Sequence, residues 1–181
     1  GCRLGRAKVI KFNHNDVEDL KAKLEEAKKI VPYTGMITIV TEGVFQHDLS
    51  IAPLKEMSKL RANNIFLIVD DSLGLGVLGA NLKGTMEYQG LTMKDIDLYC
   101  ASLEFVCDSV GGFVVGKFSV IDKQRLFGMG YTFSASAPPF TCTACIHALE
   151  EFQKRGNEMN IELSEKREKF NQIIKEKAKN V

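Results

Sequence analysis

The sequence has no excess of either charge: 24 lysines and arginines face 23 aspartates and glutamates in 181 residues, for a formal net charge of +1. The basic residues are scattered among acidic ones, so no basic face is indicated and no binding to nucleic acid is expected. No apolar run is long enough to cross a bilayer, and the N-terminus lacks the apolar core of a signal peptide. These residues therefore predict a soluble globular fragment, with any membrane anchor outside them.

A disulfide framework is also missing. The number of cysteines is odd and their spacing is irregular, which favours free thiols in a reducing compartment. Cys142 and Cys145 form a C-x-x-C pair that could bind a metal or act in redox chemistry. Because there is no second pair and the motif lies among small residues typical of a packed helix, we favour simple packing. The five cysteines are Cys2, Cys100, Cys107, Cys142 and Cys145.

The stretch from residue 65 to 79 organises the chain. A β-branched apolar run ends in Asp70 and Asp71 and is followed by glycine-rich sequence. This pattern is typical of a buried parallel strand that delivers side chains to the carboxyl edge of a sheet, where α/β proteins bind ligands. We therefore expect the functional site at that edge.

The glycines of this stretch also match a dinucleotide fingerprint. Gly74, Gly76 and Gly79 have the G-x-G-x-x-G spacing that brings a pyrophosphate to the start of a helix. A helix should follow at once, but residues 80–84 have no amphipathic period and include another glycine. The context argues against a nucleotide loop.

Hydrophobic periodicity predicts an α/β fold with a mostly parallel sheet and flanking helices. Asp16 and its neighbours supply cap chemistry for a helix over 17–30, which buries Leu20, Leu24 and Ala27. His14, beside that cap, is interpreted as a polar turn residue rather than a ligand. Strands are expected at 9–12, 36–41, 65–70, 98–103 and 111–116, helices at 53–63 and 120–127, and an extended segment at 131–139.

The C-terminal third is expected to be helical. Small residues over 140–154 indicate a buried helix, and apolar residues among alternating charges from 157 onward indicate a long one. A long helix is stabilised mainly by docking its apolar stripe, and nothing follows here for it to pack on. Residues 1–181 are therefore expected to be a fragment of one major domain, with N-terminal sequence missing and the last helix leading towards a missing small domain.

Two ordered sets of motifs run along the chain. The first set is Glu42-Gly43, the segment 70–79, Gly84, Gly90, Asp97, Gly111-Gly112 and the segment 133–139. The second set is the segment 14–16, Ser72, the segment 76–79, Ile121-Asp122 and the segment 130–136. The first set resembles the α-oxoamine synthase family, pyridoxal-phosphate-dependent enzymes of fold type I. Within that family, the second set is similar to the first, non-catalytic long-chain-base subunits of serine palmitoyltransferases.

The resemblance implies which chemical groups the chain has kept. Catalytic members carry an aspartate for the pyridine nitrogen, a histidine over the ring and a Schiff-base lysine; these positions match Asp70, Leu73 and Phe105. Leucine and phenylalanine have no titratable group, so no catalytic residue is expected here. Asp70 either keeps its cofactor contact or caps local amides. Ser134 either reaches the cofactor phosphate of the other subunit across a dimer interface or bonds its own backbone.

The resemblance further implies a heterodimer with a catalytic long-chain-base subunit, which binds pyridoxal 5′-phosphate covalently. That complex condenses L-serine with a fatty acyl-CoA such as palmitoyl-CoA to 3-ketodihydrosphingosine in sphingolipid biosynthesis, at the cytosolic face of the endoplasmic reticulum membrane. No metal is implied. Two alternatives stay open: a non-enzymatic interaction or regulatory pseudoenzyme, and an active homodimeric aminoketone synthase.

Overall fold

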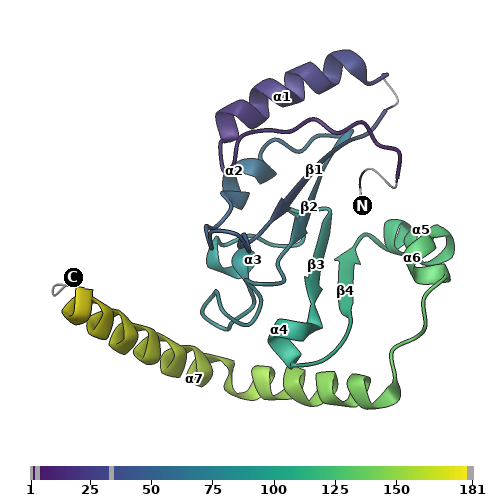
Figure 1. Ribbon diagram of the computed structural model, residues 1–181. Helices are drawn as coiled ribbons and strands as arrows, with labels where there is room; N and C mark the ends of the chain where they lie inside the picture. Colours follow the sequence, from purple (N-terminus) through teal and green to yellow (C-terminus); the bar gives the residue numbers. More distant parts are fainter. Residues whose placement is uncertain (1, 3–4, 33–34, 179–181) are drawn as a thin grey trace.

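One four-stranded sheet, in the order β1-β2-β3-β4, forms the centre of the computed structural model, which describes residues 2, 5–32 and 35–178 (Figure 1). β1 pairs in parallel with β2, and β2 in parallel with β3, whereas β4 is antiparallel to β3. The predicted α/β class with a mostly parallel sheet is confirmed. The strands are β1 (Ile37–Glu42), β2 (Ile65–Asp70), β3 (Leu98–Ser102) and β4 (Gly112–Gly116).

The first helix forms as the sequence predicts. The Asp16 side chain accepts a hydrogen bond from the Asp19 amide at 2.9 Å, which satisfies one of the free N–H groups of the first turn. Leu20, Leu24 and Ala27 are its buried residues. The helices are α1 (Val17–Ile30), α2 (Leu54–Ser58), α3 (Thr85–Tyr88), α4 (Leu103–Cys107), α5 (Phe118–Phe127), α6 (Met129–Thr132) and α7 (Pro139–Ala178).

The hydrophobic core lies between the sheet and α1 and α2. Alternate residues of β1 and β2 are buried, among them Ile39 and Leu67, and they pack in one cluster with Leu54 and Met57 of α2. Of the intervening β2 residues, Phe66 and Ile68 are half-buried and Asp70 is exposed. The central strand is thus fully covered on one face, in contrast to the two-sided burial that its unbroken apolar run suggests.

Several predicted elements differ from the structure. Residues 9–12 run without a strand assignment, and α2 ends at Ser58 rather than near residue 63. α3 and α6 are single turns, which are too short to leave a hydrophobic period in the sequence. The segment expected to be extended from residue 131 therefore begins inside α6.

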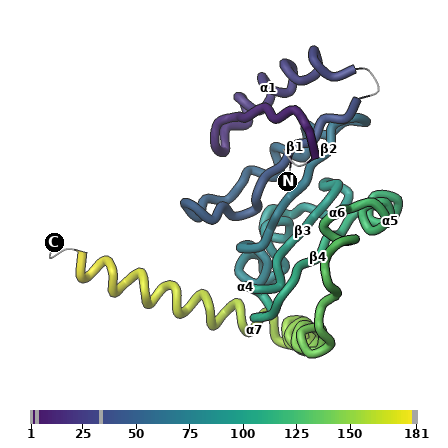
Figure 2. Tube along the Cα trace, turned by 45° about the vertical axis from the view of Figure 1, so that its right-hand side comes forward, coloured from purple at the N-terminus to yellow at the C-terminus, as the bar shows by residue number. Residues whose placement is uncertain are grey.

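α7 is one continuous helix of 40 residues rather than two helical segments. It passes beneath the sheet and then extends well beyond it (Figures 1 and 2). The predicted helix over 140–154 is confirmed as part of α7, but the buried residues of α7 are Thr141, Cys145 and Gly156, so the prediction that this stretch is buried is wrong. Small residues let one face of α7 approach the turn at Asn81 closely: a Cβ on Gly156 would lie 3.2 Å from the Asn81 carbonyl oxygen.

An ion pair fastens the connection between α2 and β2 to the start of β3. Nε and Nη2 of Arg61 each donate to Asp97 at 2.7 Å, and the same carboxylate accepts from the Leu67 amide at 2.8 Å. Partial burial alone would raise the pKa of Asp97, but the bonds from Arg61 and Leu67 outweigh it and hold that pKa below its ordinary value. Asp97, one of the residues of the family motifs, therefore has a structural role.

We expect Asp97→Ala to lower the free energy of unfolding by about 2–4 kcal/mol near pH 7, because a guanidinium and a buried strand amide lose their acceptor. A carboxyl whose pKa is depressed by folding stabilises above its unfolded-state pKa, and that contribution fades as the pH falls through the folded-state pKa. In urea unfolding at a series of pH values, the gap from wild type should shrink below roughly pH 4. Asp122→Ala, which removes an exposed pair with Arg125, is the control and should cost under about 1 kcal/mol; equal losses would contradict the assignment.

Candidate functional site

The carboxyl ends of β1, β2 and β3 meet at one edge of the sheet, where Glu42 lies opposite Asp70 and Asp70 opposite Cys100. Backbone and side-chain bonds tie the turn after β2 to both neighbours. The Gly43 amide donates to the Asp70 carbonyl at 2.7 Å, and the Ser102 amide donates to Ser72 Oγ at 2.8 Å. The turn that presents Asp70 is thus held in place from two sides.

The Asp70 side chain is exposed at this edge. Its Oδ1 accepts from the Ser72 amide at 3.0 Å and from Ser72 Oγ at 2.5 Å. In the part of the chain that the structure describes, we find no hydrogen bond to Oδ2. One oxygen therefore caps the local turn, and the other is available to a donor such as a protonated ring nitrogen, so both interpretations of Asp70 keep a structural basis.

Asp71 is fully buried and serves as the anchor of the edge. It accepts hydrogen bonds from the Thr85 amide at 2.7 Å, from Thr85 Oγ1 at 2.6 Å and from the Tyr99 hydroxyl at 2.8 Å. Burial raises the pKa of Asp71, while these donors favour its ionised form. Burial and the neighbouring Asp71 charge both raise the pKa of Tyr99, which keeps its hydroxyl a donor.

Glycines from three turns enclose the Asp71 carboxylate. A Cβ on Gly43, Gly74 or Gly84 would collide with its oxygens, and Gly84 also adopts a φ of +90° that side chains rarely tolerate. Gly74 therefore makes room for a buried carboxylate rather than for a pyrophosphate. Turns occupy the chain after Gly79, and the next helix, α3, begins only at Thr85, which agrees with the argument against a nucleotide loop.

Leu73 and Phe105 lie near the same edge, on the turn after β2 and on α4. Leu73 is half-buried, and the Phe105 ring is 56% exposed. Phe105 belongs to a short helix that begins directly after β3, where Ser102 caps it by accepting from the Glu104 amide. No lysine occurs between Lys94 and Lys117 in the sequence. Neither β3, α4 nor β4 therefore offers an amine.

Ser134 lies apart from this group. It is exposed in the connection between α6 and α7, and its Oγ is 3.5 Å from the Tyr131 carbonyl oxygen, at the limit of a hydrogen bond. That connection runs along the outer side of β4, away from β2 (Figures 1 and 2). Within this chain, Ser134 and Asp70 are not brought together.

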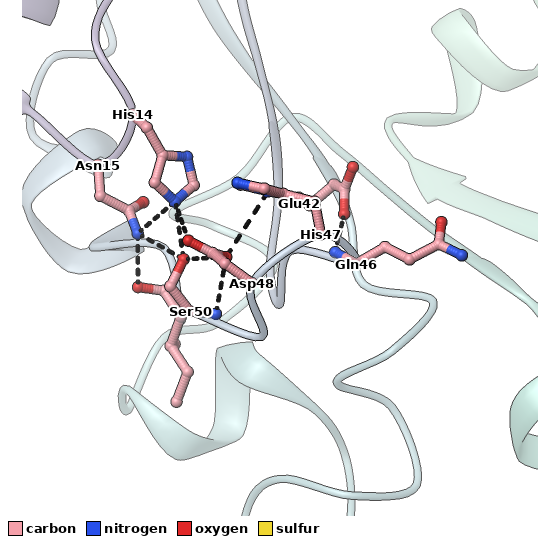
Figure 3. A network of polar contacts seen from close by, with 8 residues as sticks. His14, Asn15, Glu42, Gln46, His47, Asp48 and Ser50 are labelled. Carbon is pink, nitrogen blue, oxygen red and sulfur yellow. Dashed lines mark hydrogen bonds and ion pairs between the residues drawn. The ribbon is translucent and has the colours of Figure 1, made fainter.

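His14 belongs to a polar network that the sequence did not reveal (Figure 3). Its Nε2 lies 2.8 Å from Ser50 Oγ and 3.0 Å from Asp48 Oδ2, and Asn15 Nδ2 donates to the same hydroxyl at 3.0 Å. Because one ring nitrogen faces both partners, it cannot relay a proton from serine to aspartate as a catalytic triad does. The network fastens the segment before α1 to the loop after β1, in agreement with a structural His14.

Neither a metal site nor a membrane-spanning helix occurs within the described ranges. In those ranges, no cluster of three or more histidine, cysteine or acidic side chains has an arrangement that could hold a metal ion. Of the helices described, none combines the length and apolar character needed to cross a membrane.

The whole chain, residues 1–181, matches the family model of aminotransferase class I and II, and the protein belongs to that family. Among curated relatives, it is 37% identical over 158 residues to long chain base biosynthesis protein 1 of Arabidopsis thaliana, covering 83% of this chain and 32% of the relative. It is 39% identical over 151 residues to the serine palmitoyltransferase of Sphingobacterium spiritivorum, covering 83% and 37%. The chain spans about a third of the length of these relatives.

Solved structures place the fold in the same group. A serine palmitoyltransferase with a pyridoxal-phosphate internal aldimine superimposes with a TM-score of 0.74 at 32% identity, over 83% of this chain and 37% of that one. The 8-amino-7-oxononanoate synthase of Francisella tularensis gives a TM-score of 0.73 at 25% identity, over 97% and 49%. The expected likeness to pyridoxal-phosphate enzymes of fold type I is confirmed.

The two adjacent aspartates should respond very differently to substitution. We expect Asp71→Ala to lower the free energy of unfolding by about 3 kcal/mol, because two buried groups, Thr85 and the Tyr99 hydroxyl, lose their acceptor. Asp70→Ala, the matched control, loses only bonds to Ser72 at an exposed site and should cost less than about 1 kcal/mol. Urea unfolding of both variants measures the difference, and a larger loss at Asp70 would overturn the structural role given to Asp71.

Proposed function

We propose that this chain is part of a non-catalytic subunit of a heteromeric serine palmitoyltransferase. The complex would condense L-serine with a fatty acyl-CoA such as palmitoyl-CoA to give 3-ketodihydrosphingosine. The relatives named above support the reaction, and Phe105, at the position matched to the Schiff-base lysine, carries the assignment to a non-catalytic subunit. Residues 1–181 would form part of the major domain, with α7 leading to a small domain.

The residues at the sheet edge fit a supporting role toward the cofactor. When bound, pyridoxal phosphate supplies an electron sink for the carbanion derived from serine. On this chain, Asp70 Oδ2 is available as an acceptor, whereas residues 95–116 contain no lysine that could attach the cofactor. Covalent attachment would therefore belong to the partner subunit, and Ser134 would reach that partner's cofactor phosphate across the interface.

An exposed apolar face supports the assignment to a complex. Large apolar side chains are exposed along α5 and α6, which lie beside β4 in Figure 1, and from there along the connection to the first turn of α7. Large apolar side chains exposed on successive segments are typical of a site of protein association. We call it the β4-side face; its members are Phe118, Leu126, Phe127, Met129, Tyr131, Phe133 and Phe140.

The proposed location is the cytosolic face of the endoplasmic reticulum membrane. It is supported by the resemblance to long-chain-base subunits, and the anchor would lie in sequence outside residues 1–181. Fractionation of cells that express the full-length protein, with and without alkaline carbonate extraction, tests this location.

The chain should not form a Schiff base with pyridoxal phosphate at its sheet edge. The cofactor is added, unbound cofactor is removed by dialysis, and borohydride then reduces any Schiff base that remains. Peptide mass mapping should find no lysine modified in this way, since the matched position is a phenyl ring. A serine palmitoyltransferase with an internal aldimine is the positive control. A stable aldimine absorbance band and a single reduced lysine on this chain would instead favour the homodimeric aminoketone synthase.

A catalytic paralogue should copurify with the tagged full-length protein from its native source. We expect Phe127→Asp on the β4-side face to reduce recovery of that paralogue at least tenfold, because a buried unpaired charge costs more than the about 1.4 kcal/mol that a tenfold change requires. Phe170→Asp is the matched control, as this ring is also exposed but lies on distal α7. Normal sphingoid-base synthesis without the protein, and no copurifying paralogue, would favour a regulatory pseudoenzyme.

A further inference from the structure

Ser72 lies between the Asp70 carboxylate and strand β3. Its amide and its hydroxyl both donate to Asp70 Oδ1, at 3.0 and 2.5 Å. The same hydroxyl oxygen accepts a hydrogen bond from the Ser102 amide at 2.8 Å. Because Ser102 is the last residue of β3, the orientation of an exposed carboxylate at the end of β2 is tied to the backbone of the neighbouring strand.

These bonds give the Ser72 hydroxyl one orientation. A serine hydroxyl has a single proton, and its oxygen accepts through lone pairs. Since the Ser102 amide donates to that oxygen, the proton is left to bond Asp70 Oδ1. An exposed aspartate without such bonds rotates among several rotamers, and that freedom is lost when a ligand binds. Ser72 therefore orders the carboxylate before any ligand arrives.

The arrangement also restricts what the carboxylate can bind. Two donors from Ser72 occupy Asp70 Oδ1, whereas Oδ2 accepts from neither of them. A guanidinium binds a carboxylate best through both oxygens at once, which needs Oδ1 as well. A protonated pyridine nitrogen carries one N–H and needs only one oxygen. The remaining oxygen therefore suits a donor with a single N–H better than a forked donor.

We propose that Ser72 is a positioning residue, which holds the Asp70 carboxylate so that Oδ2 stays available to the pyridine nitrogen of the cofactor in the complex. This inference rests on the proposed function, because it takes pyridoxal phosphate as the ligand of Asp70. Ser72 acts through Asp70 and makes no contact of its own with the cofactor. Its contribution is to remove the free-energy cost of ordering the Asp70 side chain during binding.

The Ser72 hydroxyl has a structural role besides this one. Its loss leaves the Ser102 amide without an acceptor, and Ser102 in turn caps α4 by accepting from the Glu104 amide at 3.1 Å. Some loss of stability is therefore expected in Ser72→Ala whether or not Asp70 binds the cofactor. The rotamers of Asp70 and the affinity for the cofactor are the quantities that separate positioning from stability.

NMR of the 181-residue chain tests the positioning without any cofactor. Three-bond couplings of the Asp70 side chain distinguish one fixed χ1 rotamer from an average over several. Wild type and Ser72→Thr, which keeps the hydroxyl, should show one rotamer, and Ser72→Ala should show averaged couplings. Ser58→Ala, which removes a hydroxyl bonded to the Lys55 carbonyl on α2, is the control and should match wild type. Averaged couplings in wild type, or a single rotamer in Ser72→Ala, would overturn the positioning role.

The affinity of the copurified complex for its cofactor tests the second step. Absorbance titration of the cofactor-free complex with pyridoxal phosphate should give a dissociation constant about three- to tenfold higher for Ser72→Ala, with Ser72→Thr near wild type. In the Asp70→Ala background, Ser72→Ala should have no further effect, because it acts through that carboxylate.

The outcomes separate this inference from the proposed function. A weaker affinity in Asp70→Ala but none in Ser72→Ala, or equal effects of Ser72→Ala in both backgrounds, overturns the inference alone. An unchanged affinity in Asp70→Ala overturns it together with the proposed cofactor role of Asp70.

Discussion

A buried carboxylate holds the edge of the sheet together. Asp71 takes donors from Thr85 and Tyr99, which lie 14 and 28 residues further along the chain, and so joins the glycine turn and β3 to the end of β2. A buried polar group left without a partner costs free energy that is a large share of the net free energy of unfolding of a domain. The position of exposed Asp70 is therefore set by its buried neighbour, and the glycines around the carboxylate serve that arrangement.

The sequence was informative wherever structure is local. Cap chemistry and a clear period identified α1, and apolar runs identified β1 to β4 within a residue or so, because those signals lie inside each element. Single-turn α3 and α6 have no period to read. α7 contacts its neighbours at scattered residues such as Gly156 and Asn160, so its few buried positions do not follow an apolar stripe. Contacts such as Tyr99 with Asp71 join distant residues, so composition and spacing could require a partner for Asp71 but could not name it.

The candidate site came mainly from family resemblance rather than from physical pattern. Alignment pointed to Asp70, Leu73 and Phe105, and the structure gathers them near one edge, although Phe105 lies on a helix instead of at a strand end. An exposed ring makes few demands on packing, so the fold tolerates phenylalanine there without further change. The residues that maintain the scaffold are buried ones elsewhere, so the residue at this exposed position can vary without disturbing them.

α7 runs unbroken past two segments that leave the same edge of the sheet, α4 after β3 and the turns after β2. Cys145 faces α4, and Gly156, about three turns later, faces the loop at Asn81, so both contacts depend on one helical phase. Inserting a single residue between them would rotate everything beyond it by about 100° and swing the glycine away from that loop. Substitutions on the outer surface of this helix leave both contacts in place. An insertion or deletion in its middle changes the helical phase and breaks one of them.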